Sequence, residues 1–204
     1  MVLSLENIEH LVEAVLGRLF VPVEASGRHV HVTKEQALTL FGHDLTPNRP
    51  LSQPGQYLSQ ERVTMVGPKG ELDRVAVLGP ARPEAQVEVS LTDARVLGID
   101  PPIRPSGQVA GSPGITLKGP LGTVQLPQGV MVAQRHIHLN QKQARNFQVR
   151  DKQMVRLQVM TDRPVIFQDV LVRVSDQYEA AAHIDYDEAN ACNLKPGDLG
   201  RILI

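Results

Sequence analysis

The sequence is poor in residues that stabilise small secreted proteins and in residues that bind nucleic acids. Its 204 residues include one cysteine, no tryptophan, three tyrosines and four phenylalanines. The single cysteine, Cys192, excludes an intramolecular disulfide and favours a reducing compartment. The chain has 21 basic and 22 acidic residues, and its net charge is -1. Without a basic excess or many aromatic residues, it lacks the features of a nucleic-acid-binding protein.

Long apolar runs are also missing. No apolar stretch approaches the roughly 20 residues that a helix needs to cross a bilayer, so we expect no membrane segment. The first 20 residues lack the basic start of a secretory signal, because Arg18 is their first basic residue. These two absences lead us to expect a cytoplasmic protein.

Residues 1–20 instead have the pattern of an amphipathic helix. Ser4 can cap its start, and Pro22 discourages the helix from continuing past Phe20. Two interpretations stay open: a helix packed on its own domain, or a detachable helix that binds a partner. The apolar positions at helical spacing are Leu5, Ile8, Val12, Val15, Leu16 and Leu19.

Beyond Pro22 the sequence predicts a mainly β protein. Its 15 prolines and 16 glycines separate short β-branched runs, a pattern typical of antiparallel strands joined by turns. We expect β-barrels capped by short helices near 34–41, 92–97, 141–147 and 187–193. Residues 101–114 read as a long irregular connection, which in a compact domain is often functional. The expected strands include Val63–Val66, Val75–Leu78, Val87–Leu91, Val130–Val132, Val155–Val159 and Val170–Val174.

One motif occurs twice. Arg-His-Val-His-Val at 28–32 returns as Arg-His-Ile-His-Leu at 135–139, 107 positions later. Each copy is followed by an N-cap residue, Thr33 or Asn140, and then by a short predicted helix. An internal duplication is the simplest explanation.

Each copy of the motif places two histidines on one face of a strand. Residues i and i+2 of a strand point the same way, so His29 lies beside His31, and His136 beside His138. Zn²⁺ accepts imidazole nitrogens at about 2.0–2.1 Å. A single His-x-His motif could be two half-buried polar residues, but two copies in a duplicated context indicate metal binding.

The duplication also indicates a third ligand in each copy. Glu88 lies five residues before Asp93, and His183 lies five residues before Glu188, each acid at the start of a predicted helix. An exposed strand residue and a structural histidine are the alternatives. Three protein ligands leave one position open, as in catalytic zinc sites, although cobalt or nickel would accept the same donors. We therefore predict two related metal sites: His29, His31 and Glu88 in one, and His136, His138 and His183 in the other.

The remaining histidines, His10 and His43, have no partner at ligand spacing, and we expect them to face solvent. Cys192 lacks any neighbour that would activate a thiolate, so it reads as a small packed residue.

Longer motifs extend along nearly the whole chain and are specific enough to indicate a family. They are Val23–Val32, Leu51–Tyr57, Val66–Gly70, Leu78–Arg82, Gln86–Glu88, Thr92–Ala94, Gly111–Ile115, Ala133–His138 and His183–Asn190. With these motifs the chain resembles the PduL-type phosphate propanoyltransferases, which are found largely with bacterial microcompartments. This family interconverts acyl-CoA plus phosphate with acyl phosphate plus CoA.

The resemblance implies an architecture and a location. It implies two β-barrel domains, which we place at 28–135 and at 21–27 with 136–204. It implies two Zn²⁺ ions per chain, held by the six predicted ligands, with coenzyme A as a substrate. Residues 1–20 would then be a short encapsulation helix that binds shell proteins in the microcompartment lumen. An oligomer is compatible with the family.

The resemblance also implies roles for substrate-binding residues. Arg82 corresponds to the catalytic, phosphate-binding arginine, and its planar fork of donors matches phosphate oxygens. From the sequence alone, the alternatives are a surface ion pair for Arg82 and a solvated turn residue for Lys69. The positions implied to contact CoA are Ala25, Ser26, Gly27, Lys69 and Asn190.

The chain departs from the family pattern at Ala76, where a basic CoA-contacting residue is common. Arg74 lies two positions earlier, and strand alternation would place it on the same face. We therefore expect Arg74 to supply the missing charge or CoA to bind more weakly. Gly27, where an asparagine is usual, is a milder departure.

Two other functions use the same residues. Zinc ions with an open coordination position would also activate water, so a zinc-dependent hydrolase of thioesters or phosphoesters is the alternative enzyme. A non-enzymatic β scaffold that is stabilised by metal and binds a partner through its first helix is the third possibility. The sequence identifies no acyl-pocket residue, so propanoyl is an expectation from the resemblance.

Overall fold

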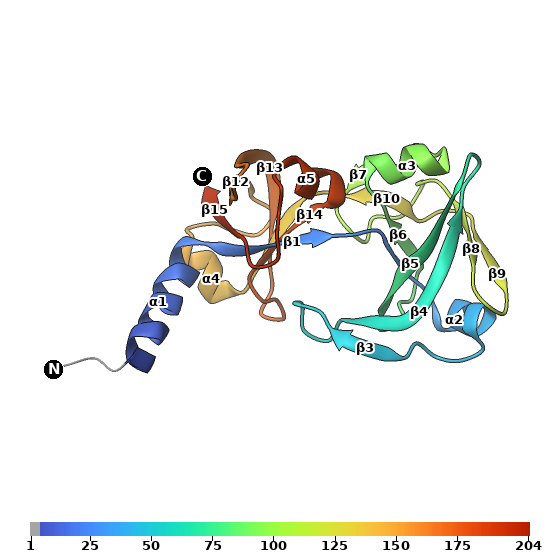
Figure 1. Cartoon of the computed structure of the whole chain (residues 1–204), viewed down its shortest axis with the longest axis horizontal. Helices are drawn as coiled ribbons and strands as arrows, with labels where there is room; N and C mark the ends of the chain where they lie inside the picture. Colours follow the sequence, from blue (N-terminus) through green and yellow to red (C-terminus); the bar gives the residue numbers. More distant parts are fainter. Residues whose placement is uncertain (1–4) are drawn as a thin grey trace. The chain divides into compact units, whose positions relative to one another are not determined.

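The computed structural model describes residues 5–204, and the predicted N-cap Ser4 lies outside this range. The protein is mainly β with short helices, as the sequence predicts (Figure 1). The chain divides into two compact units. The first unit joins the N-terminal segment through Ala25 to Arg135–Ile184 and Glu188–Ile204, and the second joins Ser26–Gln134 to Asp185–Asp187.

The first unit is built on a closed barrel with the strand order β1-β14-β11-β13-β12-β15. Strand alternation explains its core. Ile137 and Leu139 on β11 are buried in it, and so are Ala182 and Ile184 on β14. The histidines between them in sequence point away from the core. The elements are α1 (Leu5–Leu19), β1 (Val21–Ser26), β11 (His136–Leu139), α4 (Gln141–Asn146), β12 (Met154–Met160), β13 (Val165–Val174), β14 (Ala181–Asp185), α5 (Tyr186–Ala191) and β15 (Leu199–Leu203).

The second unit is built on an open, curled sheet with the order β7-β10-β6-β2-β5-β4-β8-β9, and β3 pairs with β4. The two Gly-Pro-x-Gly segments form turns, since Gly67 N–H donates to the Gly70 carbonyl and Gly119 N–H to that of Gly122, both at 2.9 Å. The elements are β2 (His29–His31), α2 (Lys34–Phe41), β3 (Pro47–Pro50), β4 (Tyr57–Val66), β5 (Glu71–Gly79), β6 (Gln86–Glu88), α3 (Leu91–Leu97), β7 (Ile103–Arg104), β8 (Ile115–Lys118), β9 (Thr123–Leu126) and β10 (Val130–Ala133).

The two units share a three-strand arrangement. In the second unit, β2 is antiparallel to β6 on one side and parallel to β5 on the other. In the first unit, β11 is antiparallel to β14 and parallel to β13 in the same way. The sheets are mainly antiparallel, as predicted, and each motif strand also has one parallel neighbour. After each motif strand the chain passes through a helix and at least one further strand before it returns parallel to that motif strand.

The helix predictions agree closely with the structure, and capping residues mark where α2, α3 and α4 start. Thr33 and Asn140 each accept a hydrogen bond from the backbone three residues later, at 3.2 and 2.9 Å. The expected strand Val87–Leu91 is too long. Ser90 already caps α3, so pairing in β6 ends at Glu88.

Several apolar side chains of helix α1 are exposed. Ile8, Leu11, Val12 and Leu19 are between 42% and 56% exposed. This apolar stripe therefore lacks the burial expected of a helix packed on its own domain. No helix within residues 5–204 is both long and apolar enough to cross a membrane.

Candidate metal centres

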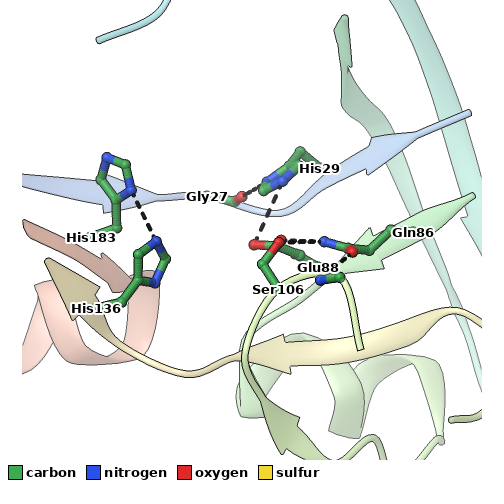
Figure 2. Close-up of polar contacts among 8 residues, drawn as sticks. Gly27, His29, Gln86, Glu88, Ser106, His136 and His183 are labelled. Atoms are coloured by element: carbon green, nitrogen blue, oxygen red, sulfur yellow. Dashed lines mark hydrogen bonds and ion pairs between the residues drawn. The ribbon is translucent and has the colours of Figure 1, made fainter. Parts of the chain in front are cut away.

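The second unit brings together the three ligands predicted from the first copy of the motif. His29 on β2 lies directly opposite Glu88 on β6 in the antiparallel register, and the two are shown in Figure 2. One donor atom from each of His29, His31 and Glu88 lies within 4.8 Å of the others, and all three residues are buried. The distance between His29 Nε2 and Glu88 Oε2 is 3.6 Å.

A hydrogen bond on the far side of the His29 ring directs a lone pair into this cluster. His29 Nδ1 donates to the Gly27 carbonyl at 2.8 Å, which leaves the Nε2 lone pair facing Glu88. His31 has a backbone hydrogen bond to Leu78, and no group within residues 5–204 bonds its Nδ1. Burial, followed by the charges of His29 and Arg82, lowers the pKa of His31 to about 2.

A polar network supports the Glu88 carboxylate from behind. Gln86 Nε2 and Ser106 Oγ both donate to Glu88 Oε1, the latter at 2.8 Å. Gln86 is itself held by the Gly107 N–H, which donates to its side-chain oxygen at 2.8 Å. Ser106 and Gly107 belong to the connection at 101–114, which the sequence singled out as irregular. This segment thus fixes the carboxylate oxygen that does not face His29 (Figure 2).

The first unit brings together the ligands predicted from the second copy. His136 on β11 lies opposite His183 on β14, with His136 Nε2 and His183 Nδ1 3.3 Å apart. The donor atoms of His136, His138 and His183 lie within 4.8 Å of one another. His138 stacks on Tyr178, with ring centroids 4.2 Å apart. Sequence reasoning missed Tyr178, which follows no motif.

The donor set of the first unit fits a metal ion. Neither ring nitrogen of His138 has a hydrogen-bond partner within the described residues, although the ring is buried. Burial, then the charges of His136, His183 and Arg173, lowers the pKa of His138 to about 2, so the ring is neutral and can coordinate. Two nitrogens on one tetrahedral zinc ion would lie about 3.3 Å apart, which matches the observed His136–His183 separation.

The arginine that precedes each His-x-His motif forms an ion pair with a carboxylate. Arg28 bonds Asp93 at 2.8 Å, and Arg135 bonds Glu188 at 2.7 Å. In both units the arginine that precedes His-x-His thus ties its strand to the helix that follows the third ligand. The sequence contained this signal, because both acids lie five residues after the third ligand, but the arginines were not paired with them.

The predicted phosphate-binding residue lies near the cluster of the second unit. Arg82 is half-buried, and its backbone N–H donates to the Val32 carbonyl at 2.9 Å, next to the motif strand. Its guanidinium is close enough to His31 to contribute to the lowered pKa of that histidine. Arg82 is therefore placed close to the predicted metal ligand His31 of its own unit.

The residues predicted to contact CoA occur in both units. Ala25 and Asn190 are exposed in the first unit, and Ser26 is half-buried in the second. Lys69 is exposed in the Gly-Pro-Lys-Gly turn, where its stem packs against Gly98. Gly27 faces the ring of Tyr186, which would lie 2.6 Å from an added Cβ, so this position accepts no larger side chain without a shift of the ring.

The predicted replacement of the missing charge by Arg74 loses its geometric basis. Ala76 lies beside His29 in the register of β2 and β5. Arg74, however, lies at a register shift of β4 and β5 and has a φ of 55°. Strand alternation does not continue through such a bulge, so it does not place Arg74 on the face of Ala76.

Comparisons with known proteins identify the family. A family model described as phosphate propanoyltransferase matches residues 22–195, a range that contains both clusters. The chain belongs to the phosphate propanoyltransferase family. It is 48% identical over 200 residues to the phosphate propanoyltransferase of Clostridioides difficile, covering 97% of this chain and 96% of the relative. It is 46% identical over 173 residues to that of Salmonella typhimurium, covering 84% of this chain and 82% of the relative.

Membership of this family confirms the predicted resemblance and the predicted enzyme class, an acyltransferase. A third relative, from Listeria monocytogenes, is 48% identical over 204 residues and is again named phosphate propanoyltransferase. The metal ions, the CoA-binding residues and the location in a microcompartment are finer points, which the family name alone does not supply.

Proposed function

We propose that the protein interconverts acyl-CoA plus phosphate with acyl phosphate plus CoA, with propanoyl-CoA as the expected acyl donor, at two zinc ions. The observation that carries the proposal is the twofold cluster. Two sets of three donors occur on equivalent strands, and each contains a buried imidazole nitrogen that no described protein group bonds. The ligands would be His29, His31 and Glu88 in one site, and His136, His138 and His183 in the other.

Arg82 would hold the phosphate. Its guanidinium lies close to His31, and a guanidinium can bind two phosphate oxygens at once. Holding phosphate in this way removes the entropy cost of bringing a hydrated anion to a thioester. Because His31 is neutral, the positive charge that would attract phosphate here belongs to Arg82 and not to the imidazole.

Bound zinc would act as a Lewis acid that polarises the thioester carbonyl and favours the developing oxyanion. The chain's own contribution is to keep the donors neutral or anionic and correctly oriented. Gly27 and Leu78 carbonyls orient the two histidines of the second unit, and the pair of Gln86 and Ser106 orients the carboxylate. Lys69, which is exposed in the Gly-Pro-Lys-Gly turn, would bind a CoA phosphate.

A CoA-release assay tests the proposal against its alternatives. Propanoyl-CoA is supplied with and without phosphate, and both CoA and acyl phosphate are measured. Transfer requires CoA release that depends on phosphate and equals acyl phosphate formed. Release without phosphate would indicate a hydrolase, and no release would indicate a scaffold. Chelation should abolish the activity, and added Zn²⁺ should restore it.

Arg82→Lys tests the phosphate role. Lysine keeps the positive charge but cannot bind two phosphate oxygens in a bidentate manner. The KM for phosphate should therefore rise, or kcat should fall, by about tenfold or more. The KM for acyl-CoA should change much less. An equal effect on both substrates would contradict a dedicated phosphate role, and Arg49→Lys, an exposed arginine on β3, is the matched control.

We further propose that α1 directs the enzyme to a microcompartment by binding a shell protein. Its exposed apolar residues, such as Leu11 and Val12, give it a face that needs a partner. Residues 1–20 fused to a fluorescent protein should co-localise with an assembled shell, and diffuse fluorescence would reject this role. The chain that begins at residue 21 should remain folded and active.

A further inference from the structure

One acidic residue contacts the histidine cluster of the first unit without being among its predicted ligands. Glu24 Oε2 lies 3.2 Å from His183 Nε2. In β1, Val21 and Val23 point into the barrel core, so Glu24 points outward, onto the face that carries His183. Strand β1 neighbours β14 in the barrel, and β14 neighbours β11. Glu24, His183 and His136 therefore lie in a row across three adjacent strands.

The two contacts of His183 fix different ring nitrogens. A carboxylate can only accept, so the contact with Glu24 requires the proton of neutral His183 to be on Nε2. Nδ1 then carries the lone pair, and it is Nδ1 that faces His136 at 3.3 Å (Figure 2). In the other tautomer the proton would lie on Nδ1, inside the cluster, where it would block coordination.

We propose that Glu24 is a positioning residue of this cluster, which accepts the Nε2–H of His183 and so presents the Nδ1 lone pair to a metal ion. The inference rests on the proposed function for the presence of the metal, but the tautomer itself is a property of the metal-free chain. A carboxylate behind a ligating histidine typically changes metal affinity by about 10- to 100-fold. Because the Glu24 side chain is 42% exposed, we expect an effect near the lower end.

The first measurement is made without metal. In protein labelled with ¹⁵N-histidine, the ring-nitrogen shifts of His183 should report the Nε2–H tautomer. Glu24→Ala should shift His183 toward a mixture of tautomers, and Glu24→Gln, which keeps an acceptor oxygen of similar reach, should shift it less. An unchanged tautomer in Glu24→Ala would overturn the proposal, whatever reaction the enzyme catalyses.

The second measurement is metal affinity, determined by competition with a chelator. His31→Ala disables the cluster of the second unit, and in that background Zn²⁺ should bind Glu24→Ala about tenfold more weakly than the parent. Asp162→Asn is the matched control, because it neutralises a different carboxylate of the same unit, which contacts Lys195 at 3.0 Å and no histidine of the cluster. An affinity that is equal in Glu24→Ala and the parent would overturn the proposal. Glu24→Gln provides the same comparison if the alanine variant does not fold.

Discussion

The two clusters of this protein have the same ligand strands but different supports. In the second unit, Gln86 lies opposite His31 in the register of β2 and β6, and it holds Glu88. The equivalent position in the first unit, opposite His138, is Ala181, which has no polar side chain. His183 instead contacts Glu24, from a strand outside the shared three-strand arrangement. The duplication has thus kept the ligand positions, while their supporting residues have diverged.

The two clusters also differ in where their negative charge lies. The second unit has one carboxylate, Glu88, among its three donors, whereas the first unit has three imidazoles. In the first unit the carboxylate of Glu24 is one residue further away, behind His183. Each site would therefore place one negative charge near a divalent ion, at a shorter distance in the second unit. Since Coulomb energy falls with distance, we expect the second unit to bind Zn²⁺ more tightly.

Removing one histidine from each cluster should have the largest effect on this comparison. His29→Ala and His136→Ala should each lose one bound zinc per chain and reduce turnover by about 10³-fold, the scale of losing an oxyanion-stabilising group. Elemental analysis and the CoA-release assay measure the two effects. His43→Ala is the control, because its side chain is 58% exposed and lies in neither cluster. Full activity without bound metal would contradict both sites.

Removing the support of Glu88 should distinguish the clusters more finely. Gln86→Ala and Ser106→Ala should each weaken Zn²⁺ binding in the second unit by about 10- to 100-fold, because the carboxylate loses its orientation. The Zn²⁺ affinity of the first unit should not change, because Gln86 and Ser106 belong to the second unit. The first unit has Ala181 at the position equivalent to Gln86, so it has no such support to lose. Chelator competition measures both affinities, with Gln60→Ala, an exposed residue of β4, as the control. Equal losses in both units would contradict separate supports.

The repeated motif is what allowed much of the site to be predicted. His-x-His and the acids that follow the third ligand are local patterns, so spacing alone located all six candidate ligands that the fold brings together. The capping residues Thr33 and Asn140 located two of the short helices in the same way. Glu24 and Tyr178 have no such pattern, because each reaches its histidine through tertiary packing. The parallel pairing of β2 with β5 is also a property of the whole sheet.

A change of pH should have a smaller effect, and it tests whether the two buried histidines behave alike. The pKa values of His31 and His138 are lowered from 6.5 to about 2, so the unfolded chain binds more protons between these values. The stability of the metal-free protein should therefore fall as the pH decreases below about 6.5, by at most about 1.4 kcal/mol per pH unit for each histidine.

Urea unfolding of the chelated protein between pH 7 and pH 5 measures this slope. His31→Asn and His138→Asn should each make it shallower, because each removes one group whose protonation is resisted in the fold. A slope that neither variant changes would contradict the buried neutral state of both rings.

The smallest expected effect concerns the arginine pairs behind the two motifs. Asp93 is only 5% exposed and also caps α3 by accepting from the Ser90 N–H, whereas the Glu188 side chain is 16% exposed. Arg135 would keep its bond to the Gln168 carbonyl if Glu188 were neutralised. Asp93→Asn should therefore lower the free energy of unfolding by about 2 kcal/mol, and Glu188→Gln by about 1 kcal/mol. Urea unfolding at pH 7 measures both, and the exposed pair of Glu71 and Lys118 supplies the control Glu71→Gln, expected to cost about 0.5 kcal/mol or less. The reverse order would mean that the first unit depends more on its arginine pair than the second.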